Sequence, residues 1–161
     1  MLRDVFGTPV SEGGAVAILE RAGKAAQPEA EAIGERVHQS AVMASDETSA
    51  RVQGRSHWES VFIGQGGEYH RIRRRRGQDV IDEFMAESQA DVWVSDCRGP
   101  QLNAPAERHP WCLPHQVLAL QGLLDQPPRL TWAREMQSLF RVAMHLGKRR
   151  ETLTAGATGG K

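Results

Sequence analysis

Several features that would assign the chain to a special class are scarce or missing. Its 161 residues include only two cysteines, too few for a disulfide framework, so a reducing compartment is expected. No apolar run approaches the roughly 20 residues that a membrane-spanning helix needs, and the N-terminus lacks a signal-peptide pattern. These absences predict a cytoplasmic protein, and the length allows one domain with a substantial core.

Charge is balanced overall but unevenly distributed. Lys plus Arg and Asp plus Glu both number 20, so the net charge indicates neither a nucleic-acid nor a membrane partner. A dense basic block nevertheless follows the third predicted strand. Clustered arginines neutralise phosphates and release counterions, which favours contact with a DNA backbone, although a solvated loop is the alternative. The candidate DNA-binding residues are Arg71, Arg73, Arg74, Arg75 and Arg76.

Hydrophobic periodicity predicts a mixed α/β fold. Two short helices are expected within residues 11–40, the first capped by Ser11 and the second opened by Pro28. Three antiparallel strands, a helix, a fourth strand and two closing helices then follow. The expected ranges are 41–53, 58–64 and 67–73 for the antiparallel strands, 78–88 for the helix and 91–95 for the fourth strand. The apolar positions of the closing helices run from Leu113 to Leu124 and from Trp132 to Ala143.

These elements divide the chain into three parts. Residues 1–40 form a helical lead-in, 41–150 form the core, and 151–161 are expected to be a disordered tail, because the end of the chain lacks bulk and periodicity.

Two predicted strands each run into an aspartate. VMASDETSARV, residues 42–52, carries Asp46, and DVWVSDCRG, residues 91–99, carries Asp96. If the fourth strand pairs beside the first through a helical crossover, the two strands are parallel and the aspartates approach each other. Neighbouring carboxylates repel each other unless a cation lies between them or one is protonated. A Mg²⁺ site is therefore one interpretation, and two solvent-facing strand ends are the other.

Longer stretches of the sequence give a second signal beside this spacing, namely a resemblance to a known family. Residues 45–64, 77–101, 111–116 and 130–146 resemble, in order, the central region of bacterial transposases of the insertion-sequence 66 family. The match covers most of residues 5–146 and includes Asp-Glu-Thr, Ser-Asp and Cys-x-x-His elements. Several elements in the family's order are more specific than any one of them.

The resemblance implies a fold, a chemistry and partners. The fold is a ribonuclease-H-like mixed sheet with flanking helices, here incomplete. The chemistry is metal-dependent transfer of DNA strands by an Asp-Asp-Glu triad, with Asp46 and Asp96 as the first two acids and Mg²⁺ or Mn²⁺ as the cofactor. DNA is the implied partner, and association with itself or with an intact transposase is a further possibility. Glu47 is expected on the opposite face of the sheet from Asp46, as support.

The resemblance also has gaps. No later acid stands in a context like that of the family's glutamate, and no upstream segment resembles a reader of DNA ends. The sequence is therefore interpreted as a transposase truncated at both ends, inactive alone because the third acid is missing. The alternative is a non-catalytic remnant that binds DNA or an intact transposase.

The Cys-x-x-His element has two interpretations. Cys112 and His115 are candidate metal ligands, and Cys97 and His109 could complete a zinc site, which gives a third hypothesis of a small zinc-stabilised domain. Structural packing is the favoured alternative, because cysteine is among the most buried residues and the spacing matches no zinc finger. Relatives usually carry an arginine three residues after this histidine, where this chain has Leu118.

Overall fold

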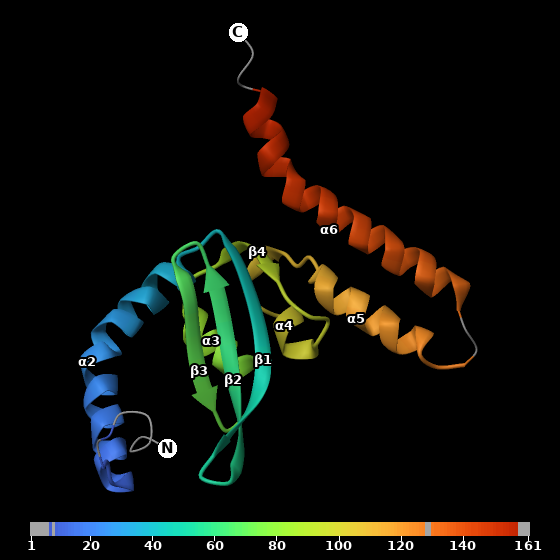
Figure 1. The fold of residues 1–161 in the computed structure, drawn as a ribbon. Helices are drawn as coiled ribbons and strands as arrows, with labels where there is room; N and C mark the ends of the chain where they lie inside the picture. The colour runs from blue at the N-terminus through green and yellow to red at the C-terminus, as the bar shows by residue number, and fades with distance from the viewer. Residues whose placement is uncertain (1–6, 8, 128–129, 158–161) are drawn as a thin grey trace.

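The computed structural model describes residue 7, residues 9–127 and residues 130–157, with side chains described to residue 150. A five-stranded mixed sheet forms its centre, and helices flank it (Figure 1). In chain order the elements are α2 (Glu12–His38), β1 (Val42–Val52), β2 (Arg55–Gly64), β3 (Gly67–Arg73), α3 (Gln78–Met85), β4 (Ala90–Val94), α4 (Gly99–Leu102), β5 (Ala106–Arg108), α5 (Leu113–Leu124) and α6 (Thr131–Ala157).

The strand order across the sheet is β3-β2-β1-β4-β5. β1, β2 and β3 form an antiparallel meander, whereas β4 pairs with β1 in parallel and β5 pairs with β4 in parallel. The predicted mixed sheet, with a fourth strand parallel to the first, is therefore confirmed. β5 and α4 were not predicted, because three or four residues are too few for a periodic pattern to be recognised.

One helix replaces the two that were expected before β1. Ser11 caps α2 as predicted, its hydroxyl accepting a hydrogen bond from Gly14 N at 3.1 Å, but α2 continues through Pro28 to His38. Proline inside a helix removes one hydrogen bond and favours a bend rather than always ending the helix. Figure 1 shows α2 as a curved helix along the β3 side of the sheet.

α6 is longer than expected. It continues through residues 151–157, which the sequence analysis assigned to a disordered tail, and residues 158–161 of that tail lie outside the described residues. Residues 151–157 contain no proline and one glycine, so a helix already formed can extend through them at little cost. In the described part of the chain, no helix is long and apolar enough to cross a bilayer.

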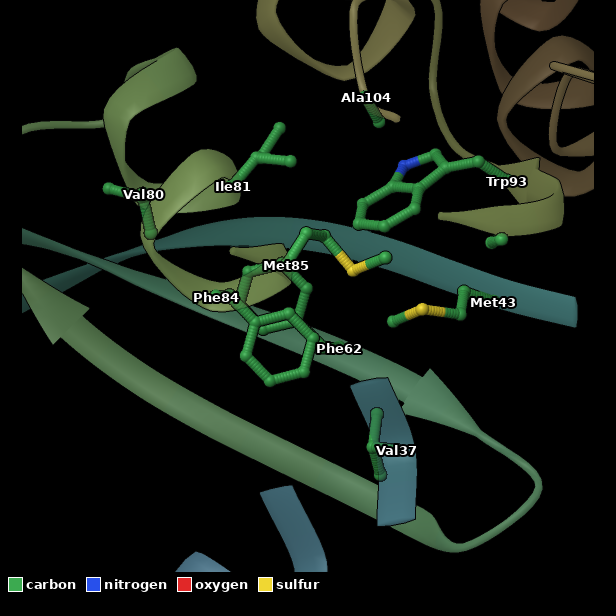
Figure 2. Close-up of a cluster of buried hydrophobic side chains, with 10 residues drawn as sticks. Val37, Met43, Phe62, Val80, Ile81, Phe84, Met85, Trp93 and Ala104 are labelled. Atoms are coloured by element: carbon green, nitrogen blue, oxygen red, sulfur yellow. The ribbon is translucent and has the colours of Figure 1, made fainter. Parts of the chain in front are cut away.

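The core lies between one face of the sheet and α3 (Figure 2). The rings of Phe62 and Phe84 stack with centroids 4.0 Å apart, and Trp93 meets Phe62 edge-on at 6.2 Å. The buried cluster takes side chains from α2, the three central strands, α3 and the segment after α4. Its members are Val37, Met43, Phe62, Val80, Ile81, Phe84, Met85, Ala90, Trp93 and Ala104.

The end of α2 packs closely on the β2–β3 turn. A Cβ added to Gly64 would lie 2.4 Å from Ser40 Oγ and 3.0 Å from the carbonyl oxygen of Val37. Ser40 Oγ also accepts a hydrogen bond from Gln65 N at 3.0 Å. Glycine at this position therefore allows the helix to sit directly against the turn.

Candidate functional site

The pairing of β1 with β4 determines where the two aspartates lie. The ladder joins Val42 to Val92 and Ala44 to Val94, an offset of fifty residues that also separates Asp46 from Asp96. Burial alternates along β1, with Met43 and Ser45 buried and Asp46 exposed. Side chains alternate across a strand, so this register, continued two residues beyond its last pair, sets Asp46 and Asp96 at the same end of the strand pair.

The two carboxylates have different surroundings. Asp46 has a side chain 54% exposed, with Oδ2 3.7 Å from His115 Nε2, whereas the Asp96 side chain is 22% exposed. Oδ2 of Asp96 lies 3.0 Å from Nε of Arg98, and its Oδ1 accepts a hydrogen bond from Arg98 N at 3.2 Å. Each acid therefore has a neighbouring group that carries positive charge, permanently in Arg98 and on protonation in His115.

The start of α5 is held beside the end of β4. Ser95 and Trp111 form a parallel bridge, and Ser95 O accepts a hydrogen bond from Cys112 N at 2.8 Å. The first turn of α5 thus brings His115 next to Asp46. An open depression of about 440 Å³ lies here, lined by Asp96, Cys97, Arg98, His115, Gln116, Leu118 and Ala119.

The possible zinc ligands are not gathered into one group. Cys97 is exposed, Cys112 is partly buried, and both are free thiols. The sulfur of Cys97 accepts a hydrogen bond from Gln116 Nε2 at 3.0 Å. Among the described residues, no three or more His, Cys, Asp or Glu side chains are arranged to hold a metal ion, so Cys112 and His115 do not share a cluster with Cys97 and His109.

The arginine block divides into residues that make contacts within the fold and residues that do not. Arg71 and Arg73 both pair with Glu83 Oε1, at 3.2 and 2.9 Å. The hydrogen bond from Arg73, together with the charges of Arg71 and Arg73, lowers the pKa of Glu83 below its ordinary value of 4.5, against an opposing effect of burial. These two arginines connect β3 to α3 and are already engaged.

The remaining arginines lie in the loop between β3 and α3. The guanidinium carbon of Arg76 lies 4.0 Å from the centre of the Trp58 ring, a cation–π contact. Arg74 and Arg75 are exposed, and within the described residues neither makes a side-chain hydrogen bond or ion pair. They are the members of the block that remain available for a phosphate.

Gln101 is a contact residue that sequence analysis did not single out. It lies in α4 and is 3% exposed. Its Oε1 accepts hydrogen bonds from Trp93 Nε1 at 3.2 Å and from Ser45 Oγ, while its Nε2 donates to Glu47 Oε1 at 3.2 Å. A glutamine in a four-residue helix carries no periodic signal, so only the folded arrangement reveals these contacts.

A protein-family model matches most of the chain. The model described as "Transposase IS66 family" matches residues 1–155. The chain belongs to this family of transposases. The resemblance found in the sequence is thereby confirmed, and DNA transposition is the process to which the family belongs.

Similarity to other known proteins is weak. No curated protein matches the chain. Among solved structures, a chain from the cryo-EM structure of the simian T-cell lymphotropic virus intasome in complex with PP2A regulatory subunit B56 gamma is 12% identical, with a TM-score of 0.36. The match covers 65% of this chain and 48% of the other, so this chain spans about half the length of the chain it matches.

The donor set of the two aspartates fits a hard divalent ion. Mg²⁺ is usually bound in proteins by one or two carboxylates and completes its shell with water and substrate phosphates. Asp46 and Asp96 provide two carboxylates just beyond the last pair of the β1–β4 ladder, and Asp46 is open to solvent. Cys112 and His115 would instead suit a softer metal.

Proposed function

We propose that this chain carries the two-aspartate part of a metal-dependent DNA transposase site. Asp46 and Asp96 would hold Mg²⁺ or Mn²⁺ from neighbouring strands. The parallel register of β1 and β4 is the observation that supports this assignment most strongly. When bound, such ions activate a water and stabilise the leaving oxygen of a phosphodiester.

The proposal for the isolated chain is ion binding without strand transfer. The family's chemistry uses three acids, whereas the described residues contain no cluster of three His, Cys, Asp or Glu side chains suited to a metal. Asp46 and Asp96 would then hold an ion and its water, while the third carboxylate would have to come from outside this pair. Supplying that carboxylate is the condition for activity.

Calorimetric titration with Mn²⁺ tests the first step. The wild-type chain should bind Mn²⁺, and the Asp46→Asn/Asp96→Asn variant should lose that binding. Asp91→Asn/Asp125→Asn is the matched control, because it removes the same charge from exposed positions and should leave the binding unchanged. Equal binding by all three proteins would reject Asp46 and Asp96 as ligands.

Contact with DNA is a second candidate function, favoured by two arginines that have no side-chain partner in the part of the chain that the structure describes. Arg74 and Arg75 lie exposed between β3 and α3, where a phosphate backbone could reach them. Each phosphate contact contributes about 0.9 to the slope of log affinity against log salt concentration for duplex DNA.

The Arg74→Gln/Arg75→Gln variant should therefore show weaker DNA binding and a salt slope smaller by nearly two. The Arg21→Gln/Lys24→Gln variant removes the same charge from exposed positions of α2 and should keep the wild-type slope. A fall of equal size in both variants would mean that only net charge matters, and would reject the loop as a specific contact.

A further inference from the structure

The amide of Gln101 connects the two strands that carry the aspartates. Trp93 lies on β4 and is fully buried, while Ser45 and Glu47 flank Asp46 on β1. Gln101 meets all three side chains: its oxygen accepts from Trp93 and Ser45, and its nitrogen donates to Glu47. Figure 2 shows the indole nitrogen of Trp93 on the side of the ring toward Ala104, which follows α4.

The contact is chemically directional. The indole N–H of Trp93 can only donate, and an ionised Glu47 carboxylate can only accept. A primary amide is the side chain that offers an acceptor to one and a donor to the other. Rotating the amide by half a turn would set N–H against N–H and oxygen against oxygen, so the orientation of Gln101 is determined by its neighbours.

The contact lies beyond the point where backbone pairing ends. The β1–β4 ladder closes at Ala44 and Val94, two residues before each aspartate. The Gln101 amide continues the connection on the buried face, through Ser45 and Glu47 on one side and Trp93 on the other. Asp46 stands between the two β1 residues that Gln101 holds, with its own side chain on the opposite face.

We infer that Gln101 is a positioning residue for the Asp46–Asp96 pair, and this inference rests on the proposed function. It touches neither carboxylate and acts through the backbone of β1. Groups that hydrogen-bond to metal ligands typically change metal affinity by about 10–100-fold when they are removed, and for Gln101, which acts one step further away, we expect the lower end of that range.

The first test compares Gln101→Met with Gln137→Met. Gln137 is also buried and also donates to two acceptors, Val117 O and Gln121 Oε1, but between α5 and α6. Both variants should lose stability through their unpaired polar neighbours. Only Gln101→Met should also weaken Mn²⁺ binding in calorimetry, by about tenfold or more.

A variant in which Glu47 and Gln101 are exchanged tests whether the hydrogen bonds, rather than the glutamine itself, are what matters. In Glu47→Gln/Gln101→Glu the net charge is unchanged, and a carboxylate at position 101 can accept from Trp93, Ser45 and the new amide at position 47. Mn²⁺ affinity should return to near the wild-type value. Because all three hydrogen bonds are kept, this variant should fold even if Gln101→Met does not.

Three results would overturn the inference. One is a Gln101→Met protein that unfolds earlier than wild type but binds Mn²⁺ equally well. Another is a folded swapped variant that has lost the binding. The third is amide hydrogen exchange at residues 45–47, without metal, that Gln101→Met leaves as slow as in wild type. Absence of aspartate-dependent binding in the wild-type chain would instead reject the proposed function, and the exchange measurement would still decide the role of Gln101.

Discussion

The sheet and the α5–α6 hairpin bury apolar side chains in different ways. All ten members of the main core come from the sheet, α2, α3 and the segment after α4, and none comes from α5 or α6. Within the described residues, the hairpin buries only Leu120, Ala133 and Gln137. Its exposed large apolar residues are Leu118, Leu123, Trp132, Met136, Leu139, Val142 and Leu146.

This difference has a consequence for the candidate site. Asp46 and Asp96 belong to the well-packed region, and His115 belongs to the hairpin. The contact between Asp46 and His115 therefore joins a rigid element to one with few buried contacts. Regions with low contact density open at lower free energy than the global unfolding of a protein. The aspartates should consequently stay in place when the hairpin moves.

The largest expected effect is in the main core. Phe62→Ala removes a ring that is 1% exposed and packs on both Phe84 and Trp93. Loss of a buried aromatic side chain costs about 3–5 kcal/mol of unfolding free energy. Urea denaturation followed by circular dichroism measures this loss. A cost below about 1 kcal/mol would show that the sheet is no better packed than the hairpin.

Native-state hydrogen exchange should show the same contrast without a mutation. Amides near Ala44 of β1 and Val92 of β4 should exchange only on global unfolding, because at these positions each strand is paired on both sides. Amides of α5 and α6 should exchange at a lower free energy of opening. Equal protection in the two regions would mean that they unfold as one unit.

A smaller effect is expected at the Glu83 ion pairs, which connect β3 to α3 within the sheet region. The pKa of Glu83 is lower in the folded chain than its ordinary value of 4.5. Its contribution to stability is therefore present above that value and is lost as pH falls through the lower folded pKa. Because the side chain is half exposed, the contribution at neutral pH should stay within about 1 kcal/mol.

Comparison of Glu83→Gln with wild type in urea titrations from pH 7 to about pH 3 measures this contribution. The difference in stability should shrink in the acidic part of the range. A difference that does not depend on pH would mean that the carboxylate charge of Glu83 is not what stabilises the contact.

The smallest expected effect is on the exposed side of the hairpin. Leu139 is 60% exposed, so Leu139→Ala should change stability by no more than about 0.5 kcal/mol. The same urea titration serves as the measurement, with Phe62→Ala as the reference for a buried position. A loss of several kcal/mol would show that Leu139 is covered in solution.

Much of the fold could be predicted from the sequence alone. The antiparallel strands 41–53, 58–64 and 67–73, the helix beginning at residue 78 and the parallel fourth strand follow from periodicity and glycine-rich turns. The spacing of Asp46 and Asp96 also follows, since each acid comes directly after a short apolar stretch that ends in serine. These signals depend only on residues that are close in sequence, so the folding of the rest of the chain does not change the structure that they predict.

Other features depended on tertiary contacts. The sequence analysis defined the last helix by apolar positions that include Trp132, Met136 and Leu139. These three side chains are exposed, whereas α6 turns Ala133 and Gln137 toward α5. A polar Gln137 in that interface is stabilised by Val117 O and Gln121 on the facing helix, and no pattern within α6 could indicate such partners.

The sequence by itself determined the strands and the fifty-residue spacing of Asp46 and Asp96, because repeating apolar side chains specify which face of each strand is buried. Only the tertiary structure decided that Gln101 meets Trp93, Ser45 and Glu47, that His115 lies beside Asp46, and that Arg71 and Arg73 are engaged by Glu83. These contacts join residues from different elements. Their geometry exists only after the sheet has formed.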